Sequence, residues 1–118
     1  MRESLRDPLR LKHMVDAINN VNSYMKDQSE KDLENNSMLF YAVVKNIEII
    51  GEAAYKLTNE FKETHPDTPW RQIISMRHIL VHGYYQVCAD EIFNVYIQDL
   101  PTLHQQLTSY IDESDPMS

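Results

Sequence analysis

The chain has 118 residues, a formal net charge of −7, 42% hydrophobic residues and only two glycines, Gly51 and Gly83, which therefore mark special places. This length suits one domain with one modest core, and so little glycine argues against an all-β chain rich in tight turns. The acidic balance argues against a broad phosphate-binding surface, so contacts with nucleic acid must come from a few well-placed cations or from a site shared between subunits.

Several other classes of protein are disfavoured by the composition. The single cysteine, Cys88, cannot form an internal disulfide and offers no zinc-ligand spacing. No apolar run approaches the ~18 residues of a membrane span, and the start of the chain lacks the apolar segment of a signal peptide. We therefore expect a cytoplasmic protein with no membrane association, formed by one domain over residues 1–112 and a disordered tail over 113–118.

The first predicted helix follows Asp7 and Pro8, which have the pattern of an N-cap and a proline at the first helical position. Apolar residues then recur at helical spacing: Leu11, Met14, Val15, Ile18, Val21 and Met25. This pattern predicts an amphipathic helix with one buried stripe. The polar stretch 27–36 is expected to hold a connection and the frayed start of the second helix.

The second predicted helix, 37–57, has apolar residues around most of its circumference. Such a helix must be surrounded, so we place it at the centre of a bundle or in a dimer interface. Its narrow polar stripe consists of Tyr41, Lys45, Glu48, Glu52 and Lys56. Because Glu48 and Glu52 lie four residues apart, like charges adjoin, and we expect a cation to face them. Lys45 and Lys56 are the local candidates.

A third helix is predicted after a break in the pattern. Thr68 is expected to be its N-cap, with Pro69 at the first helical position. The apolar pattern of 70–81 predicts the helix itself, and Gly83 is well placed to end it.

The last part of the chain predicts either one kinked helix or two. Helical patterns cover 89–99 and 101–111. Pro101 lies between them and cannot donate the backbone hydrogen bond that a continuous helical ladder needs. Together, these segments predict an all-α domain.

The third helix carries most of the chemical information. Arg77 falls angularly between Ile73 and Val81, inside the apolar stripe. An arginine cannot lose its charge, and burying it without a partner is costly, so Arg77 must meet carboxylates or an anion. His82 lies at the C-terminal end of the same helix, where the helix dipole favours the protonated ring. We therefore expect His82 to exchange protons near neutral pH.

Arg77 and His82 form a sufficient pair for cleaving RNA without a metal ion. The ribose 2′-hydroxyl is an internal nucleophile. The imidazole can take its proton or protonate the leaving 5′-oxygen, while the guanidinium stabilises the charge on the phosphoryl oxygens. Glu48 or Glu52 is a candidate to orient Arg77, and without a second cluster at metal-ligand spacing these glutamates are not expected to bind a metal. His78 either lines the cleft or is an exposed surface residue.

The pattern Arg77-x4-His82-x-Tyr84 resembles the Arg-x4-His-x-Tyr signature of HepT-type HEPN toxins. The polar His78 directly after the arginine also suits the HEPN pattern. Further segments resemble other parts of the family in the same order: 47–54 its second-helix signature, Pro69-Trp70 the entry to its motif helix, and Leu100-Pro101 the kink in its last helix. The resemblance spans most of residues 8–112.

The resemblance implies a HEPN-type bundle of four to five helices that forms a homodimer, with two motif loops meeting at a composite cleft. It implies metal-independent RNA cleavage by Arg77 and His82, with tRNA as one candidate substrate, no cofactor and no DNA substrate. The implied partner is a minimal nucleotidyltransferase antitoxin that attaches adenylate to Tyr84. A bulky anionic group two residues from His82 blocks the cleft and repels RNA.

Two other interpretations stay open on the sequence. The acidic balance also suits a non-catalytic module that binds, or presents a substrate to, a nucleotidyltransferase. The same arginine–histidine cleft could instead belong to a sensor that binds a mononucleotide without turnover.

Overall fold

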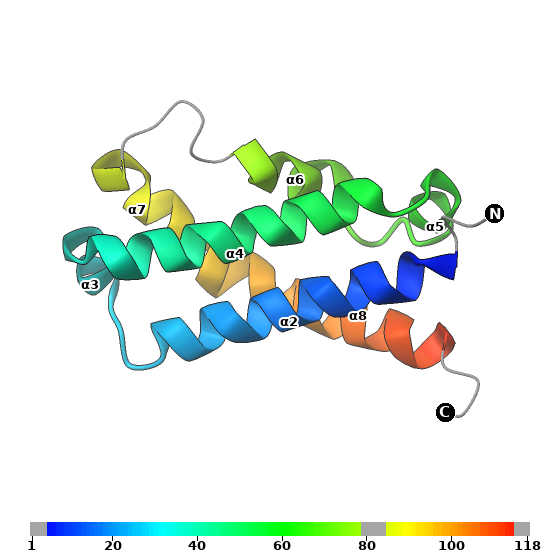
Figure 1. Ribbon diagram of the computed structural model, residues 1–118, viewed down its shortest axis with the longest axis horizontal. Coiled ribbons are helices and arrows are strands. Elements are labelled where there is room, and N and C mark those ends of the chain that lie inside the picture. The colour runs from blue at the N-terminus through cyan, green and yellow to red at the C-terminus, as the bar shows by residue number, and fades with distance from the viewer. Residues whose placement is uncertain (1–4, 79–84, 115–118) are drawn as a thin grey trace.

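The computed structural model describes the backbone of residues 5–78 and 85–114, and the side chains of these residues except 85–88 and 114. These residues are almost entirely helical and contain no strand (Figure 1). The prediction of an all-α fold is confirmed. Within the described ranges, no helix is both long enough and apolar enough to cross a bilayer.

Two long helices form the centre of the bundle. α2 (Asp7–Met25) and α4 (Ser37–Lys56) run side by side in opposite directions (Figure 1). Their fully buried side chains belong to one core and include Leu11, Met14, Ile18 and Val21 from α2 and Phe40, Val43, Ile47 and Ile50 from α4. Burying each such side chain stabilises the fold by roughly 1.5–3 kcal/mol, so this pair of helices is the scaffold on which the other elements pack.

Asp7 joins the start of α2 to the end of α4. The predicted N-cap role of Asp7 is wrong, because α2 begins at Asp7 itself and Arg6 occupies the N-cap position without a side-chain cap. The buried Asp7 carboxylate accepts hydrogen bonds from the backbone N of Thr58 at 3.0 Å and from its Oγ1 at 2.7 Å. Nearby, burial lowers the pKa of Lys62, and the charge of Asp7 opposes that shift.

Two short helices occupy segments that the sequence pattern assigned to connections. α3 (Glu30–Asn35) starts with a capping box, in which Ser29 and Asp32 accept each other's backbone N–H. α5 (Asn59–Thr64) is capped by the hydroxyl of Thr58. Each helix is shorter than two turns, so its apolar periodicity carries almost no signal.

α6 (Trp70–Ser75) is shorter than the helix predicted through Val81. After Ser75 the chain tightens into a 3₁₀ turn, η1 (Met76–His78), and the next described residue is Tyr85. Both α6 and η1 pack against α4 (Figure 1). Because a 3₁₀ turn advances each residue by about 120° instead of 100°, η1 changes the directions in which its side chains leave the backbone.

The loop before α6 is tied to the last helix rather than to α6. Thr68 is not the predicted N-cap, since Pro69 takes that position without a side-chain cap. The buried hydroxyl of Thr68 instead donates to Oε1 of Gln106 at 2.9 Å and is hydrogen-bonded to the hydroxyl of Tyr110. Nε2 of Gln106 donates to the carbonyl of Asp67 at 3.2 Å. The Thr68 hydroxyl, which could have capped α6, therefore binds Gln106 and Tyr110 of α8 instead.

The C-terminal part is a helical run with one irregular turn. α7 (Tyr85–Asn94) passes into a π-helical turn, η2 (Val95–Asp99), and then into α8 (Leu100–Ser114), which packs on α2. Pro101 is the second residue of α8, so the irregular turn ends where the proline leaves a backbone carbonyl without its helical donor. The predicted disordered tail was 113–118. Its first two residues belong to α8, which continues to Ser114, and 115–118 lie outside the described residues.

Candidate active site at the 3₁₀ turn

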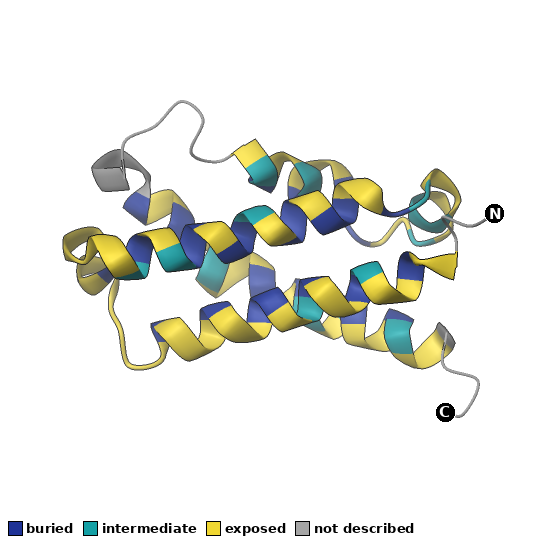
Figure 2. Ribbon diagram, viewed as in Figure 1, coloured by how far each residue is buried: buried dark blue, intermediate teal, exposed yellow. Residues whose placement is uncertain are grey.

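α4 is covered on two flanks and exposed along one ridge (Figure 2). α2 covers one flank, and α6 with η1 covers the other. We define the α4 ridge by its exposed residues: Met38, Tyr41, Lys45, Ile49, Glu52, Tyr55 and Lys56. α4 is covered on its core-facing sides, as predicted, and the ridge includes four residues of the predicted polar stripe, Tyr41, Lys45, Glu52 and Lys56. The alternative position in a dimer interface stays a prediction.

Gly51 allows η1 to approach α4 closely. It is buried in α4, and a Cβ at this position would lie 2.6 Å from the backbone N of Arg77 and 3.0 Å from the carbonyl O of Ile73. A Cβ essentially never lies as close as 2.6 Å to a backbone atom, so any side chain here would push η1 away. The missing side chain of Gly51 therefore determines where the backbone of Arg77 lies.

The side chain of Arg77 leaves η1 toward the α4 ridge. Its Cζ lies 3.8 Å from the centroid of the Tyr55 ring, which is a cation–π contact. Its Nε donates to Nε2 of His78 at 3.1 Å. Its Nη1 lies 4.0 Å from Oε2 of Glu52, close enough for an ion pair and too far for a hydrogen bond. Tyr55 thus contacts the face of the guanidinium and His78 accepts from its Nε. The N–H groups on its Nη atoms remain available to donate to an anion.

The hydrogen bond with Arg77 determines which form of His78 supports the site. A guanidinium only donates, so Nε2 of His78 must accept and the ring proton must lie on Nδ1. A protonated His78 could not accept this bond and would place a second cation beside Arg77. Neutral His78 is therefore the form that holds Arg77 in this orientation.

An open hollow of about 190 Å³ adjoins the guanidinium and is lined by Lys45, Glu48, Ile49, Glu52 and Arg77. Two cations and two carboxylates thus face one small space. The cations can bind a phosphate, and the two carboxylates balance their formal charge in the absence of a ligand. Glu52 is shared, because its Oε1 also lies 4.0 Å from Nζ of Lys56.

Three of the predicted site residues, Arg77, Glu48 and Glu52, line this hollow. His78 does not line it: the residue is exposed, and its Nε2 accepts a hydrogen bond from Nε of Arg77. The other two, His82 and Tyr84, lie outside the described residues, so the meeting of imidazole and guanidinium stays a prediction. In the part of the chain that the structure covers, no three His, Cys, Asp or Glu side chains are grouped as metal ligands.

Tyr55 is a site residue that sequence reasoning missed. It follows Glu52 by three residues on α4, so the two side chains lie on the same face of the helix. That spacing is the signal that could have identified it. Its ring contacts one face of the guanidinium of Arg77.

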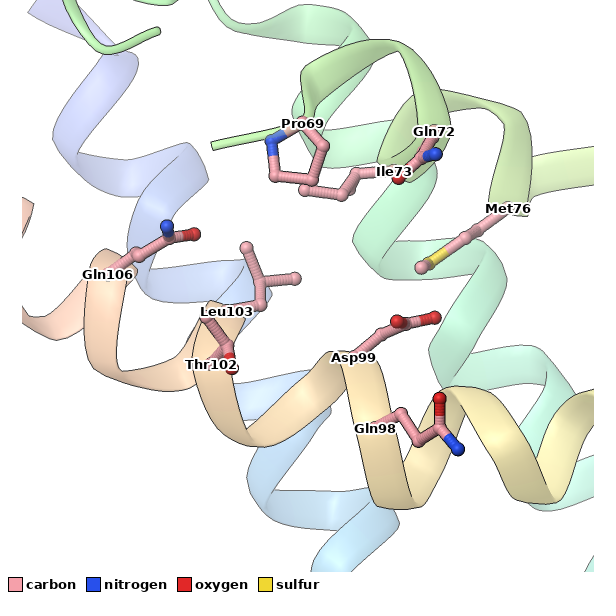
Figure 3. Close-up of a pocket in the computed structure, with 9 residues that line it drawn as sticks. All are labelled: Pro69, Gln72, Ile73, Met76, Gln98, Asp99, Thr102, Leu103 and Gln106. Atoms are coloured by element: carbon pink, nitrogen blue, oxygen red, sulfur yellow. The ribbon is translucent and has the colours of Figure 1, made fainter. Parts of the chain in front are cut away.

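A more enclosed cavity of about 220 Å³ lies on the other side of η1, between α6 and the run of η2 and α8 (Figure 3). Its apolar lining consists of Pro69, Ile73, Met76 and Leu103, and its polar lining of Gln72, Gln98, Asp99, Thr102 and Gln106. Among the residues described here, the lining has one carboxylate and no Lys, Arg or His. It lacks the cations that bind a phosphate, whereas the hollow at Arg77 has two.

Comparisons with known proteins identify the family of this chain. The family model described as "Ribonuclease HepT-like" matches residues 14–110. "Probable ribonuclease HepT" of Thermococcus cleftensis is 31% identical over 103 residues, which cover 87% of this chain and 92% of that protein. "Putative RNase MJ1380" of Methanocaldococcus jannaschii is 31% identical over 94 residues, covering 80% of this chain and 86% of that protein. No solved structure matches the chain.

A longer relative contains the same unit beside another one. "Gamma-glutamylcyclotransferase and putative RNase MJ0434" of Methanocaldococcus jannaschii is 33% identical over 115 residues, which cover 98% of this chain and 51% of that protein. Together with the family match, these relatives confirm the resemblance drawn from the motif and its flanking segments. This all-α, HEPN-type chain belongs to the HepT-like ribonuclease family.

Proposed function

We propose that this chain is the ribonuclease toxin of a toxin–antitoxin pair and cleaves RNA phosphodiesters without a metal ion. The observation that carries the proposal is the placement of Arg77. Gly51 determines its backbone position, Tyr55 and His78 hold its guanidinium, and its side chain lines an open hollow. A cation fixed in this way needs no reorganisation when charge develops on a phosphate. Membership in a ribonuclease family supports RNA as the substrate.

In this proposal, Arg77 holds the scissile phosphate and His82 moves the proton. The ribose 2′-oxygen attacks phosphorus, so that a P–O2′ bond forms and the bond to the 5′-oxygen breaks. A neutral imidazole takes the proton of the 2′-hydroxyl, and an imidazolium gives one to the leaving 5′-oxygen. The products are a 2′,3′-cyclic phosphate and a 5′-hydroxyl. In a dimer with two motif loops at one cleft, one His82 could be neutral and act as the base while the other is protonated and acts as the acid.

The exposed apolar end of the α4 ridge supports a homodimer as the active unit. Met38 is 83% exposed and Tyr41 is 53% exposed, and adjoining apolar side chains on a surface are typical of contact sites. We expect Met38→Lys to shift the chain from dimer toward monomer in size-exclusion chromatography with light scattering. A dimer that persists in Met38→Lys and in Tyr41→Lys would exclude this surface as the contact.

The proposed partner is a minimal nucleotidyltransferase antitoxin, and Tyr84 is the proposed acceptor of adenylate. Intact-mass spectrometry after incubation with such an enzyme and ATP should show added adenylate and loss of RNA cleavage. Tyr84→Phe should stay unmodified and active, whereas the matched control Tyr85→Phe should behave like wild type. Modification of Tyr84→Phe would place the acceptor elsewhere.

The decisive test is cleavage of tRNA, the candidate substrate, by the purified chain free of partner and modification. We expect cleavage to persist with a chelator and to stop when a 2′-deoxynucleotide replaces the ribose at the cut. His82→Ala should lower the rate at least roughly 10²-fold, as loss of a general acid or base does, with unchanged circular dichroism. Failure of the wild type to cut any cellular RNA would overturn the proposal and favour a non-catalytic module that serves the nucleotidyltransferase.

A further inference from the structure

We propose that Arg10 and Lys56 form a second phosphate subsite, which binds an RNA phosphate that flanks the scissile phosphate held by Arg77. This inference rests on the proposed ribonuclease function and extends it to residues outside the motif. Arg10 belongs to α2 and Lys56 to the last turn of α4. The two helices bring these cations together although they are far apart in the sequence.

A second hollow lies between α2 and α4. It measures about 160 Å³ and is lined by Arg10, His13, Ile49, Glu52, Ala53 and Lys56. Ile49 and Glu52 also line the hollow at Arg77, so the two hollows adjoin across the α4 ridge. The distance across the ridge is about the 10 Å diameter of one helix. An RNA strand that crosses the ridge from η1 to α2 therefore passes both hollows.

Arg10 has a donor that the protein leaves unused. Its Nε is buried and has no hydrogen-bond partner among the residues that the structure describes. A buried N–H without an acceptor is costly, and we expect a small movement of this long side chain to bring it to an acceptor in the hollow. Phosphate oxygens suit a guanidinium especially well, because two parallel N–H groups can bind two oxygens.

Positive charge is concentrated around the two hollows against an acidic background. Four of the 11 Lys and Arg residues of this chain, whose net charge is −7, line them: Arg10, Lys45, Lys56 and Arg77. Glu48 and Glu52 are the two carboxylates in the same linings, so cations are in excess locally. Such a local excess attracts an anionic ligand that the rest of the surface repels.

Glu52 links the two hollows without neutralising them. It lies 4.0 Å from a cation on each side, Lys56 and Arg77, and its side chain is 50% exposed. Exposed ion pairs at this separation contribute little, so phosphates can replace the carboxylate at both cations. When a phosphate binds in one hollow and displaces the Glu52 carboxylate from the cation there, Glu52 keeps its contact with the cation of the other hollow.

The test measures cleavage of unfractionated tRNA by the full-length chain. For Arg10→Gln and Lys56→Gln, we expect KM to rise roughly 3–10-fold while kcat stays unchanged, because a flanking subsite binds ground and transition states equally. The dependence of log KM on log salt should weaken by about 0.7 for each lost phosphate contact. The matched control is Lys12→Gln, which removes the same charge from an exposed position of α2 that lines neither hollow.

Thermal melting shows whether each variant folds. Because Nε of Arg10 is buried, Arg10→Gln carries a risk of misfolding, and the exposed Lys56→Gln then decides the outcome alone. If folded Lys56→Gln keeps the KM and salt dependence of Lys12→Gln while the wild type cuts tRNA, the subsite is wrong and the ribonuclease proposal stands. If the wild type cuts no RNA, the ribonuclease proposal fails and the subsite fails with it.

Discussion

The two sides of η1 differ in the properties that decide what each can bind. On one side, Met76 lines an enclosed cavity of amide and apolar side chains with one carboxylate. On the other, the next residue, Arg77, adjoins an open hollow with two cations and two carboxylates. Enclosure favours neutral ligands that bury apolar surface, whereas a phosphate needs charge. In this acidic chain, the placement of charge therefore identifies the candidate site better than depth does.

Removing the charge of Arg77 should have the largest effect on this comparison. We expect Arg77→Ala to lower RNA cleavage roughly 10²–10³-fold, the usual cost of losing one group that stabilises an oxyanion. Arg77→Lys keeps the charge but loses the planar fork, so it should recover only part of the rate. The control Arg71→Ala, at an exposed position of α6, should stay active. Full activity of Arg77→Ala would exclude the hollow at Arg77 as the active site.

Gly51→Ala tests whether η1 is held against α4. Helix propensity alone would favour alanine by about 1 kcal/mol. The new methyl group would meet the backbone N of Arg77 at 2.6 Å, and such overpacking typically costs about 1–3 kcal/mol. We therefore expect a lower free energy of unfolding by chemical denaturation, together with reduced cleavage. A stabilised Gly51→Ala protein would show that the close approach does not exist.

Tyr55 should have a smaller effect, because it acts on Arg77 through its ring. Tyr55→Leu loses a cation–π contact worth about 0.5–1 kcal/mol, so cleavage should fall roughly two- to fivefold. Tyr55→Phe keeps the ring and serves as the matched control, with an unchanged rate. Equal losses in both variants would assign the effect to the hydroxyl instead.

The smallest effect is expected on the enclosed side of η1. Asp99→Asn removes the one carboxylate among the described lining residues and keeps the shape of the side chain. Because Asp99 is exposed, the free energy of unfolding should change by no more than about 0.5 kcal/mol, with cleavage within about twofold of wild type. A large loss of cleavage in this folded variant would mean that both sides of η1 serve the reaction.

The long helices could be predicted because their periodicity extends over many turns. The second helix was expected over 37–57 and is observed as Ser37–Lys56. α3 and α5 escaped prediction because two turns hold too few apolar positions to define a face. Their N-caps, Ser29 and Thr58, carried the only local signal. For Asp7 and Thr68, the residue types suggested caps, but buried partners elsewhere in the chain take their polar atoms.

The candidate site could be predicted in part. An arginine on an apolar stripe already requires carboxylates or an anion, and the structure places Arg77 beside Glu52. The close approach of η1 to α4 was not predictable, because it brings Arg77 against Gly51, which is distant in the sequence. The subsite at Arg10 was missed for the same reason, since only the pairing of α2 with α4 brings it to Lys56.

The π-helical turn η2 determines which face of α8 points into the core. Burial in this part of the chain passes from Ile92 to Leu100 and continues at Leu103 and Leu107. One residue more or fewer in this turn would rotate α8 by about 100° about its axis. Leu103 and Leu107 would then turn away from the core. The segment therefore tolerates changes of residue type far better than changes of length, and natural variation there should consist of substitutions rather than insertions or deletions.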